Sequence, residues 1–210
     1  MLKEVGDEGM FIQPLFGVRV APFIIAVIIF CFFTEKAKSE RKKSMDSFIS
    51  LLATWFVLFF SIKFVTKWEI FIDNPMAVLA YPSGTQEFYI ASVILMLVAW
   101  IKRADHLPRF YDYILMLSIS LFSYTVITRL GLENGHWVDL VLAAIFLLGT
   151  LLFRNPYWLV VGIGVISGVT GLFIYTPTIL GYRMHAGFYL LMAGLVLILI
   201  FRKKEATTGQ

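Results

Sequence analysis

The sequence predicts an all-α, polytopic membrane protein with seven transmembrane helices, and three observations support this. Of its 210 residues, 59% are hydrophobic and only 15% are charged, with a mean hydropathy of +0.81. These values lie well outside the averages for soluble globular domains. Seven apolar stretches approach the ~20 residues that a transmembrane helix needs. Basic residues recur after every second stretch, which is typical of a multispanning protein.

The expected spans cover residues 15–33, 48–65, 87–101, 110–128, 137–153, 157–175 and 185–201. Pro14 and Pro22 lie near the outer half of the first span, where proline breaks or kinks a helix. About 70 residues remain for loops and tails, and no single connection is long enough for a soluble domain of ordinary size. The sequence therefore predicts one integral membrane domain over residues 1–210.

The longest connection, residues 66–86, lies between the second and third spans. It is rich in aromatic residues and proline: Trp68, Phe71, Pro75, Tyr81 and Pro82. Aromatic side chains concentrate where a membrane meets water. This segment is therefore expected to lie along the outer leaflet as an amphipathic or re-entrant stretch.

The positions of the basic residues predict the orientation of the chain. Five follow the first span, three the third, one the fifth and three the seventh, which is twelve of the 18. Under the positive-inside rule these loops are cytoplasmic. The N-terminus is therefore expected outside and the C-terminus in the cytoplasm. The same placement explains the net charge of +4 without a nucleic-acid partner.

Ionisable residues within or beside the spans are the best candidates for a functional site, because charges inside a bilayer are costly. With the expected topology, eight of them fall on the external side: Arg19, Lys63, Glu87, Arg129, His136, Asp139, Arg183 and His185. An arginine fork binds phosphate bidentately and keeps its charge in a low-dielectric site. Arg19 and Arg129 therefore suit a phospholipid headgroup.

Several of these residues also have a structural interpretation. Lys63 can extend to the outer interface as an anchor, and Glu87 and Asp139 can mark helix N-termini, where a negative charge favours the helix dipole. Arg129 can pair with Glu133 one turn away. The spacing of Gly164 and Gly168 predicts close helix packing, with a slot for an acyl chain as the alternative.

No metal site is expected, because the three histidines, His106, His136 and His185, are dispersed and show no ligand spacing. The single cysteine, Cys31, excludes an intramolecular disulfide and a cysteine metal cluster. The sequence therefore calls for no metal and no other cofactor.

Several segments occur in the order found in one bacterial enzyme family. Residues 13–19 are similar to the family's opening Gly-Pro-Leu, which precedes an arginine entering the first helix, and residues 35–46 resemble its charged first cytoplasmic loop. Residues 74–80 and Gly84 are similar to the stretch before its glycine-rich segment. Arg129-Leu130-Gly131 lies where its signature Gly-Arg-x-Gly-Asn-Phe begins. The chain thus resembles bacterial prolipoprotein diacylglyceryl transferase along most of its length.

That resemblance implies a substrate, a reaction and a location. The family takes phosphatidylglycerol from the outer leaflet of the bacterial plasma membrane and transfers its diacylglyceryl group to the cysteine thiol of a lipoprotein precursor. Such chemistry needs cations for the headgroup and a base for the thiol. The resemblance implies that Arg19, Lys63 and Arg129 bind the headgroup and that His136 or Tyr89 handles the proton. The implied partners are anionic phospholipid and either a lipoprotein precursor or another membrane protein.

Three functions stay open on the sequence alone. Tyr89 stands where the family has a histidine, and Trp137 follows His136 where it has a proline. The chain is therefore expected to be either a divergent transferase or a homologue that binds lipid or lipoprotein without transfer. The third alternative is a small transporter. Transporters carry polar residues through the middle of several helices, whereas the charges here lie on one side.

Overall fold

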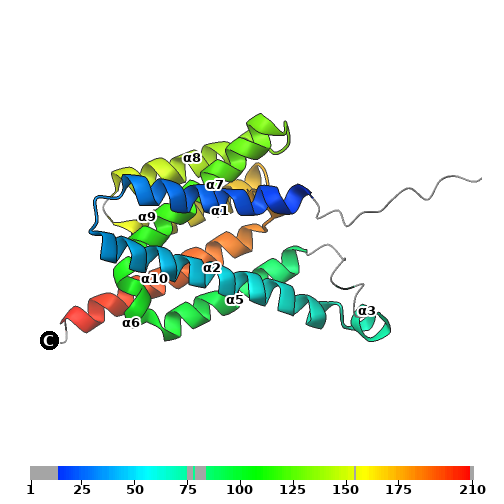
Figure 1. Ribbon diagram of the computed structural model, residues 1–210, viewed down its shortest axis with the longest axis horizontal. Helices are drawn as coiled ribbons and strands as arrows, with labels where there is room; N and C mark the ends of the chain where they lie inside the picture. The colour runs from blue at the N-terminus through cyan, green and yellow to red at the C-terminus, as the bar shows by residue number, and fades with distance from the viewer. Residues whose placement is uncertain (1–13, 75–77, 79–83, 154, 209–210) are drawn as a thin grey trace, which may run out of the picture.

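Helices form nearly all of the described structure, a computed structural model in which residues 14–74, 78, 84–153 and 155–208 are described (Figure 1). The main helices are α1 (Pro14–Phe33), α2 (Lys38–Thr66), α5 (Thr85–Ile101), α7 (Phe110–Val126), α8 (Trp137–Leu152), α9 (Pro156–Phe173) and α10 (Ala186–Thr208). Each of the seven apolar stretches expected from the sequence is a helix. The helical class of the fold is therefore confirmed.

Shorter elements connect these helices. They are α3 (Trp68–Asp73), α6 (Arg103–His106), a 3₁₀ turn (Leu107–Arg109), a π-helical turn (Ile127–Gly131) and the antiparallel strands β1 (Thr178–Ile179) and β2 (Tyr182–Arg183). The small β1–β2 hairpin is the one departure from an all-helical chain among the described residues. The sequence did not predict it, because it falls in a connection of only a dozen residues.

Three helical segments are long and apolar enough to cross a membrane: Lys38–Thr66, Leu107–Gly131 and Pro156–Phe173. Four shorter apolar helices accompany them: Gly17–Phe33, Thr85–Ile101, Trp137–Leu152 and Ala186–Ile198. Large apolar side chains cover their outward faces, among them Val57, Leu148 and Leu172. Soluble monomers rarely expose apolar surface of this extent, so the chain is a membrane protein.

The helix boundaries differ from the expected spans at two places. Helix α2 begins at Lys38, ten residues before the expected span, because Lys, Glu and Arg in the charged connector are good helix formers. Helix α10 likewise continues to Thr208. Helix α1 runs through Pro22 without a break.

The connection between α2 and α5 contains a short helix at its start. Helix α3 carries Trp68 and Phe71, whose rings lie 5.6 Å apart, and Trp68 is exposed. This is consistent with an interfacial segment. Pro75, Tyr81 and Pro82 lie outside the described residues.

Adjacent helices pack as a few close groups. Helix α1 lies along α7, α7 along α8, α2 along α5, and α9 along α10. A cluster of aromatic rings joins these groups: Trp55 stacks on Phe59 with centroids 5.1 Å apart, and Phe88 meets Tyr182 at 5.3 Å. The predicted close packing at Gly164 and Gly168 is confirmed. A Cβ on Gly164 would lie 3.0 Å from the Tyr189 carbonyl oxygen, and one on Gly168 would lie 2.9 Å from Leu190.

Candidate functional site at one end of the bundle

Ionisable side chains gather at one end of the helix bundle. At the right-hand end in Figure 1, α1 begins, α2 ends and α5 begins. Because the long helices alternate in direction, the connection from α7 to α8 and the β1–β2 hairpin belong to this end as well. All eight ionisable residues expected on the external side therefore lie on elements that meet here.

Arg19 is held between two tyrosines. Its Nη1 donates a 2.7 Å hydrogen bond to the Tyr182 hydroxyl, and its guanidinium carbon lies 4.4 Å from the centre of the Tyr182 ring. Tyr124 also interacts with this guanidinium. The Nε of Arg19 is buried and has no hydrogen-bond partner in the protein. One N–H of the fork is thus left for an acceptor supplied from outside the chain.

The β1–β2 hairpin positions Tyr182. Its two central residues, Leu180 and Gly181, have φ values of +52° and +82°, as a type I′ turn requires. A Cβ on Gly181 would lie 2.6 Å from the Tyr124 hydroxyl and 3.5 Å from Nη2 of Arg19. The tight turn therefore brings its backbone against both Arg19 and Tyr124.

Burial raises the pKa of the Tyr182 hydroxyl above its ordinary value, with Arg19 opposing the shift. Tyr182 is therefore a neutral phenol at neutral pH. It accepts the hydrogen bond from Arg19 and leaves the guanidinium charge uncompensated, which is the condition needed to hold an anion.

Lys63 and Glu87 form a second charged pair at this end. Glu87 is 2% exposed and accepts 2.7 Å hydrogen bonds from the Thr66 hydroxyl and the Gly84 backbone N–H. The bond to Gly84 caps the start of α5, so the helix-terminus interpretation of Glu87 is confirmed. Lys63 is 3% exposed and lies within the field of Glu87. It therefore does not extend to the outer interface, and the bond that joins α2 to α5 here is the one from Thr66 to Glu87.

Asp139 forms a third buried charge, at the start of α8. Its carboxylate accepts hydrogen bonds from the Thr178 N–H at 2.9 Å, the Thr178 hydroxyl at 2.7 Å and the Tyr175 hydroxyl at 3.3 Å. These contacts fasten β1 to α8. Its place in the first turn agrees with the helix-terminus interpretation, but its donors come from residues nearly forty positions away.

Arg129 and His136 lie in the exposed connection between α7 and α8. The Arg129 guanidinium packs 4.7 Å from the Trp137 ring and donates a long, 3.5 Å hydrogen bond to the Gly135 carbonyl. Its Nε is also buried without a partner. Glu133 does not pair with it in the described structure. No hydrogen bond or ring contact among the described residues connects Arg129 to Arg19.

The two candidates for proton transfer are already hydrogen bonded. Nδ1 of His136 accepts from the Val138 backbone N–H at 3.2 Å and caps α8, and the His136 ring stacks on Tyr175 with centroids 4.1 Å apart. The Tyr89 hydroxyl accepts a 2.7 Å bond from the His185 backbone N–H. In this geometry the imidazole lone pair is occupied, and Tyr89 retains only its phenolic proton.

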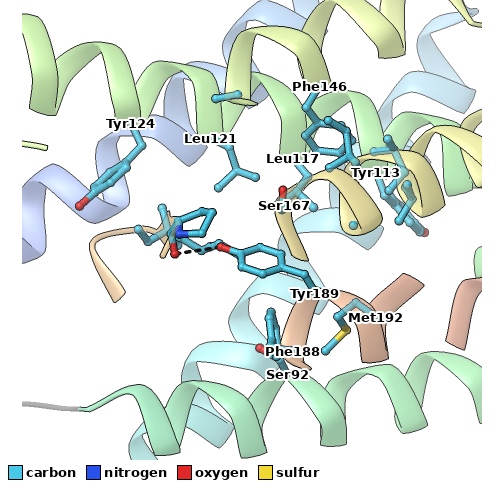
Figure 2. Close-up of a pocket in the computed structure, with 18 of the residues that line it drawn as sticks. Ser92, Tyr113, Leu117, Leu121, Tyr124, Phe146, Ser167, Phe188, Tyr189 and Met192 are labelled. Carbon is cyan, nitrogen blue, oxygen red and sulfur yellow. Dashed lines mark hydrogen bonds between the residues drawn. The ribbon is translucent and has the colours of Figure 1, made fainter. Parts of the chain in front are cut away.

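A cavity of about 440 Å³ runs inside the bundle between the helix groups, from Phe48 and Phe110 to Asp139 and Thr178 at this end. It is within the usual size range of small-ligand pockets. Figure 2 shows Tyr113, Leu117, Leu121 and Tyr124 of α7 facing it, opposite Tyr189 and other residues of α10. These α7 residues span eleven positions, or about 16 Å of helix rise, so the cavity is elongated along the bundle.

The wall of the cavity is almost wholly apolar and aromatic. The few polar side chains in it are Ser92, Tyr124, Thr125, Asp139, Ser167, Thr178 and the tyrosines Tyr113 and Tyr189. Tyr189 is occupied by a 3.1 Å bond to the Pro177 carbonyl, which Figure 2 draws. Tyr124, Asp139 and Thr178 bring polar groups to one end of the cavity, and Tyr124 also interacts with Arg19, which is not part of the wall. The cavity therefore offers an apolar slot with a polar end.

Sequence reasoning identified Arg19 but missed Tyr182, Tyr124 and the cavity. A tyrosine in a short loop carries no sequence signal for contact with an arginine 163 positions away. The Leu180-Gly181 pair, a glycine-containing turn, was the signal that could have revealed the hairpin. No metal-binding cluster of His, Cys, Asp or Glu occurs in the described part of the chain.

Comparisons with protein families, with curated proteins and with solved structures found no match for this chain.

Proposed function

We propose that this protein binds a phosphatidylglycerol-type phospholipid at the outer leaflet of the bacterial plasma membrane and does so without transferring its diacylglyceryl group. One observation carries the proposal: the Arg19 guanidinium, with one buried N–H free, interacts with Tyr124, which lines an elongated apolar cavity of about 440 Å³. A phospholipid has the matching parts, an anionic phosphate joined to apolar chains. The phosphate accepts from Arg19, and an acyl chain fills the cavity.

The proposed topology has seven spans with the N-terminus outside. Seven apolar helices and the basic residues of alternate loops support it. In this orientation Arg19, Lys63 and Arg129 lie at outer-leaflet depth. Arg19 is the main phosphate ligand, while Arg129, in the exposed α7–α8 connection, provides a second cation near the membrane surface. Lys63 adds positive potential from within the bundle.

Two hydrogen bonds favour binding over transfer. A transferase needs a base to deprotonate the acceptor thiol, but His136 uses its Nδ1 lone pair to cap α8. Tyr89 is the other candidate, and its hydroxyl oxygen already accepts a hydrogen bond from the His185 backbone N–H. The polar residues inside α7 do not favour a transporter, because Ser118 and Ser120 bond carbonyls of their own helix.

The binding proposal is tested by the lipid that the protein retains. Protein purified in mild detergent is extracted, and its phospholipid is quantified by mass spectrometry per mole of protein. We expect roughly stoichiometric anionic phospholipid in the wild type and a severalfold loss in Arg19→Ala. Arg183→Ala is the matched control, an exposed arginine at the same end of the bundle. Equal retention by the two variants, or none by the wild type, contradicts the proposal.

Arg19→Lys separates the charge of the guanidinium from its fork. Lysine keeps the positive charge but lacks the fork that binds phosphate bidentately, so we expect retention between that of the wild type and that of Arg19→Ala. Transfer is tested in a strain depleted of its own diacylglyceryl transferase, with the mass of a reporter lipoprotein as the readout. Lipidated reporter would show that the protein is an enzyme after all.

Orientation is tested with single cysteines, since Cys31 is the one native cysteine. In a Cys31→Ser background, a cysteine at the exposed Asn134 is expected to react with a membrane-impermeant maleimide in intact cells. A cysteine at Glu40 is expected to react only after the cells are opened. The reverse pattern would overturn the proposed topology.

A further inference from the structure

Asp139 is a buried carboxylate that faces the cavity without a cationic partner. It is 6% exposed and contributes to the cavity wall. Its three hydrogen bonds come from neutral donors, the Thr178 N–H and hydroxyl and the Tyr175 hydroxyl. No ion pair reaches it among the described residues, in contrast to Asp112, which pairs with Lys36. A negative charge in such surroundings is costly and calls for a further donor.

The carboxylate has room for that donor. Two carboxylate oxygens offer about four acceptor positions, and the protein fills three of them. Oδ1 receives the Thr178 N–H alone, whereas Oδ2 receives both hydroxyls. One position on Oδ1 is therefore available to a ligand in the cavity.

The β1–β2 hairpin anchors both this carboxylate and Arg19. Thr178, which bonds Asp139, pairs with Arg183, and Ile179 pairs with Tyr182, which bonds Arg19. Successive pairs of a hairpin point to opposite faces, so the hairpin alone does not bring the two charges together. Tyr124 links them, because it interacts with Arg19, lies within the field of Asp139 and lines the cavity. Asp139 therefore lies in the cavity wall, and the Arg19 cation lies behind the same wall at Tyr124.

We infer that Asp139 selects the headgroup, accepting a hydrogen bond from an O–H or N–H at the headgroup's far end while Arg19 holds the phosphate. This inference rests on the proposed lipid-binding function and narrows its ligand. Suitable headgroups are glycerol, through a hydroxyl, and ethanolamine, through its ammonium group. A headgroup with no such donor leaves the Asp139 carboxylate buried and unsatisfied. Sites built to bond a donor discriminate strongly against analogues that lack it.

The test uses lipids matched in charge and acyl chain. Phosphatidylglycerol and phosphatidylmethanol both carry one negative charge and differ in the hydroxyl donors. Phosphatidylethanolamine and phosphatidylcholine are both zwitterionic and differ in the N–H donors. Each lipid competes with a fluorescent phosphatidylglycerol on the full-length protein in detergent micelles. We expect a donor lipid to bind at least about tenfold more tightly than its matched partner, the size expected for one hydrogen bond to a charged group.

The four lipids also identify the headgroup. A preference within the glycerol pair assigns a hydroxyl donor, and one within the ethanolamine pair assigns an ammonium donor. Either result supports the role of Asp139. If the wild type binds all four lipids equally, the inference fails while the lipid-binding function stands. If it binds none of them, the proposed function itself fails.

Asp139→Asn distinguishes two roles of Asp139, selection of the lipid headgroup and anchoring of the hairpin. It removes the charge, and we expect the preference within the matched pair to fall to about twofold or less while binding of the donor-free lipid persists. An equal loss for both members of a pair would show that Asp139 only anchors β1 and would overturn the inference. Thr178→Val is the control, since it deletes one donor to the same carboxylate but keeps the charge. It should keep the preference. If Asp139→Asn does not fold, the four-lipid comparison on the wild type still decides, because equal binding of all four lipids overturns the inference.

Discussion

Arg19 and Tyr182, 163 positions apart in the sequence, are joined by a 2.7 Å hydrogen bond and by stacking of the guanidinium over the ring. The bond joins α1, the first helix, to the β1–β2 hairpin, which precedes the last helix, α10. It also fixes the orientation of the guanidinium. The direction in which the free Nε–H points therefore depends on the position of Tyr182.

Tyr182→Phe separates these two contacts. The ring remains under the guanidinium, but Nη1 loses its acceptor in a buried place. We expect the free energy of unfolding to fall by about 1–3 kcal/mol, the usual effect of leaving a buried donor unsatisfied, and lipid retention to fall with it. Denaturant titration in detergent measures the first and mass spectrometry the second. Tyr111→Phe is the control, since the Tyr111 hydroxyl also makes one long-range bond, of 3.2 Å, to the Thr150 carbonyl. Equal effects of the two variants on lipid retention would mean that Tyr182 does not position Arg19.

The ion pair at the opposite end of the bundle predicts that removing one partner costs more stability than removing the other. Lys36 donates to both oxygens of Asp112, at 2.6 and 2.8 Å, and the Ser44 hydroxyl donates at 2.5 Å. The side chain of Lys36 is 40% exposed, whereas that of Asp112 is 2% exposed. Removal of Lys36 leaves the Asp112 carboxylate buried without an ion-pair partner. Removal of Asp112 leaves a lysine that water can solvate.

Lys36→Met is therefore expected to be more destabilising than Asp112→Asn, by about 3 kcal/mol of unfolding free energy against about 1–2. Lys38→Met, an exposed lysine two positions away, should change stability by less than about 0.5 kcal/mol. Thermal or denaturant unfolding of the three variants in one detergent measures the order. A smaller loss for Lys36→Met than for Asp112→Asn would refute the explanation.

Substitution of Gly181 by alanine is expected to lower stability, unlike the same substitution at an ordinary helical glycine. It has φ +82°, and a Cβ there would lie 2.6 Å from the Tyr124 hydroxyl. Gly181→Ala is expected to lower the unfolding free energy by about 1–3 kcal/mol through backbone strain and to weaken lipid retention by displacing Tyr124. Gly187→Ala lies in α10 with nothing near its Cβ, and alanine there should be neutral or stabilising. Similar melting temperatures for the two variants would contradict the proposed turn.

His106 predicts a dependence of stability on pH. Burial lowers its pKa below the ordinary value; Lys102 and Arg109 act in the same direction and Asp105 opposes them. The ring lies 3.2 Å from the Tyr113 hydroxyl, which donates to Ser47. The unfolded chain takes up a proton more readily than the folded one, so this contribution to stability is complete above about pH 6.5 and is lost as pH falls through the folded pKa.

His106→Gln is expected to flatten this dependence. Unfolding of the wild type and the variant is compared between pH 7.5 and pH 5 in the same detergent. The stability difference between them should shift in favour of the variant as the pH falls. A difference that does not change with pH would show that His106 does not titrate with folding.

The sequence by itself determined the helices. Runs of apolar residues leave the backbone no partners but its own when lipid surrounds it, so each of the seven predicted stretches is a helix, from Pro14–Phe33 to Ala186–Thr208. Pro156, beside the Asn155 cap, marks the start of α9. The positions of Arg19, Lys63 and Glu87 near helix ends likewise followed from hydropathy alone, since charges avoid the apolar middle of a span.

Only the tertiary structure decided which of these charges meet. Arg19 contacts Tyr182 and Tyr124, and Asp139 contacts Thr178. Arg129 bonds only within the connection between α7 and α8 among the described residues. The hairpin that makes the first two contacts contains only four strand residues, too few for a period to be read from the sequence. The cavity is equally hidden, because its wall belongs to seven helices and the hairpin. An apolar side chain facing a cavity has the same sequence pattern as one facing a neighbouring helix or lipid.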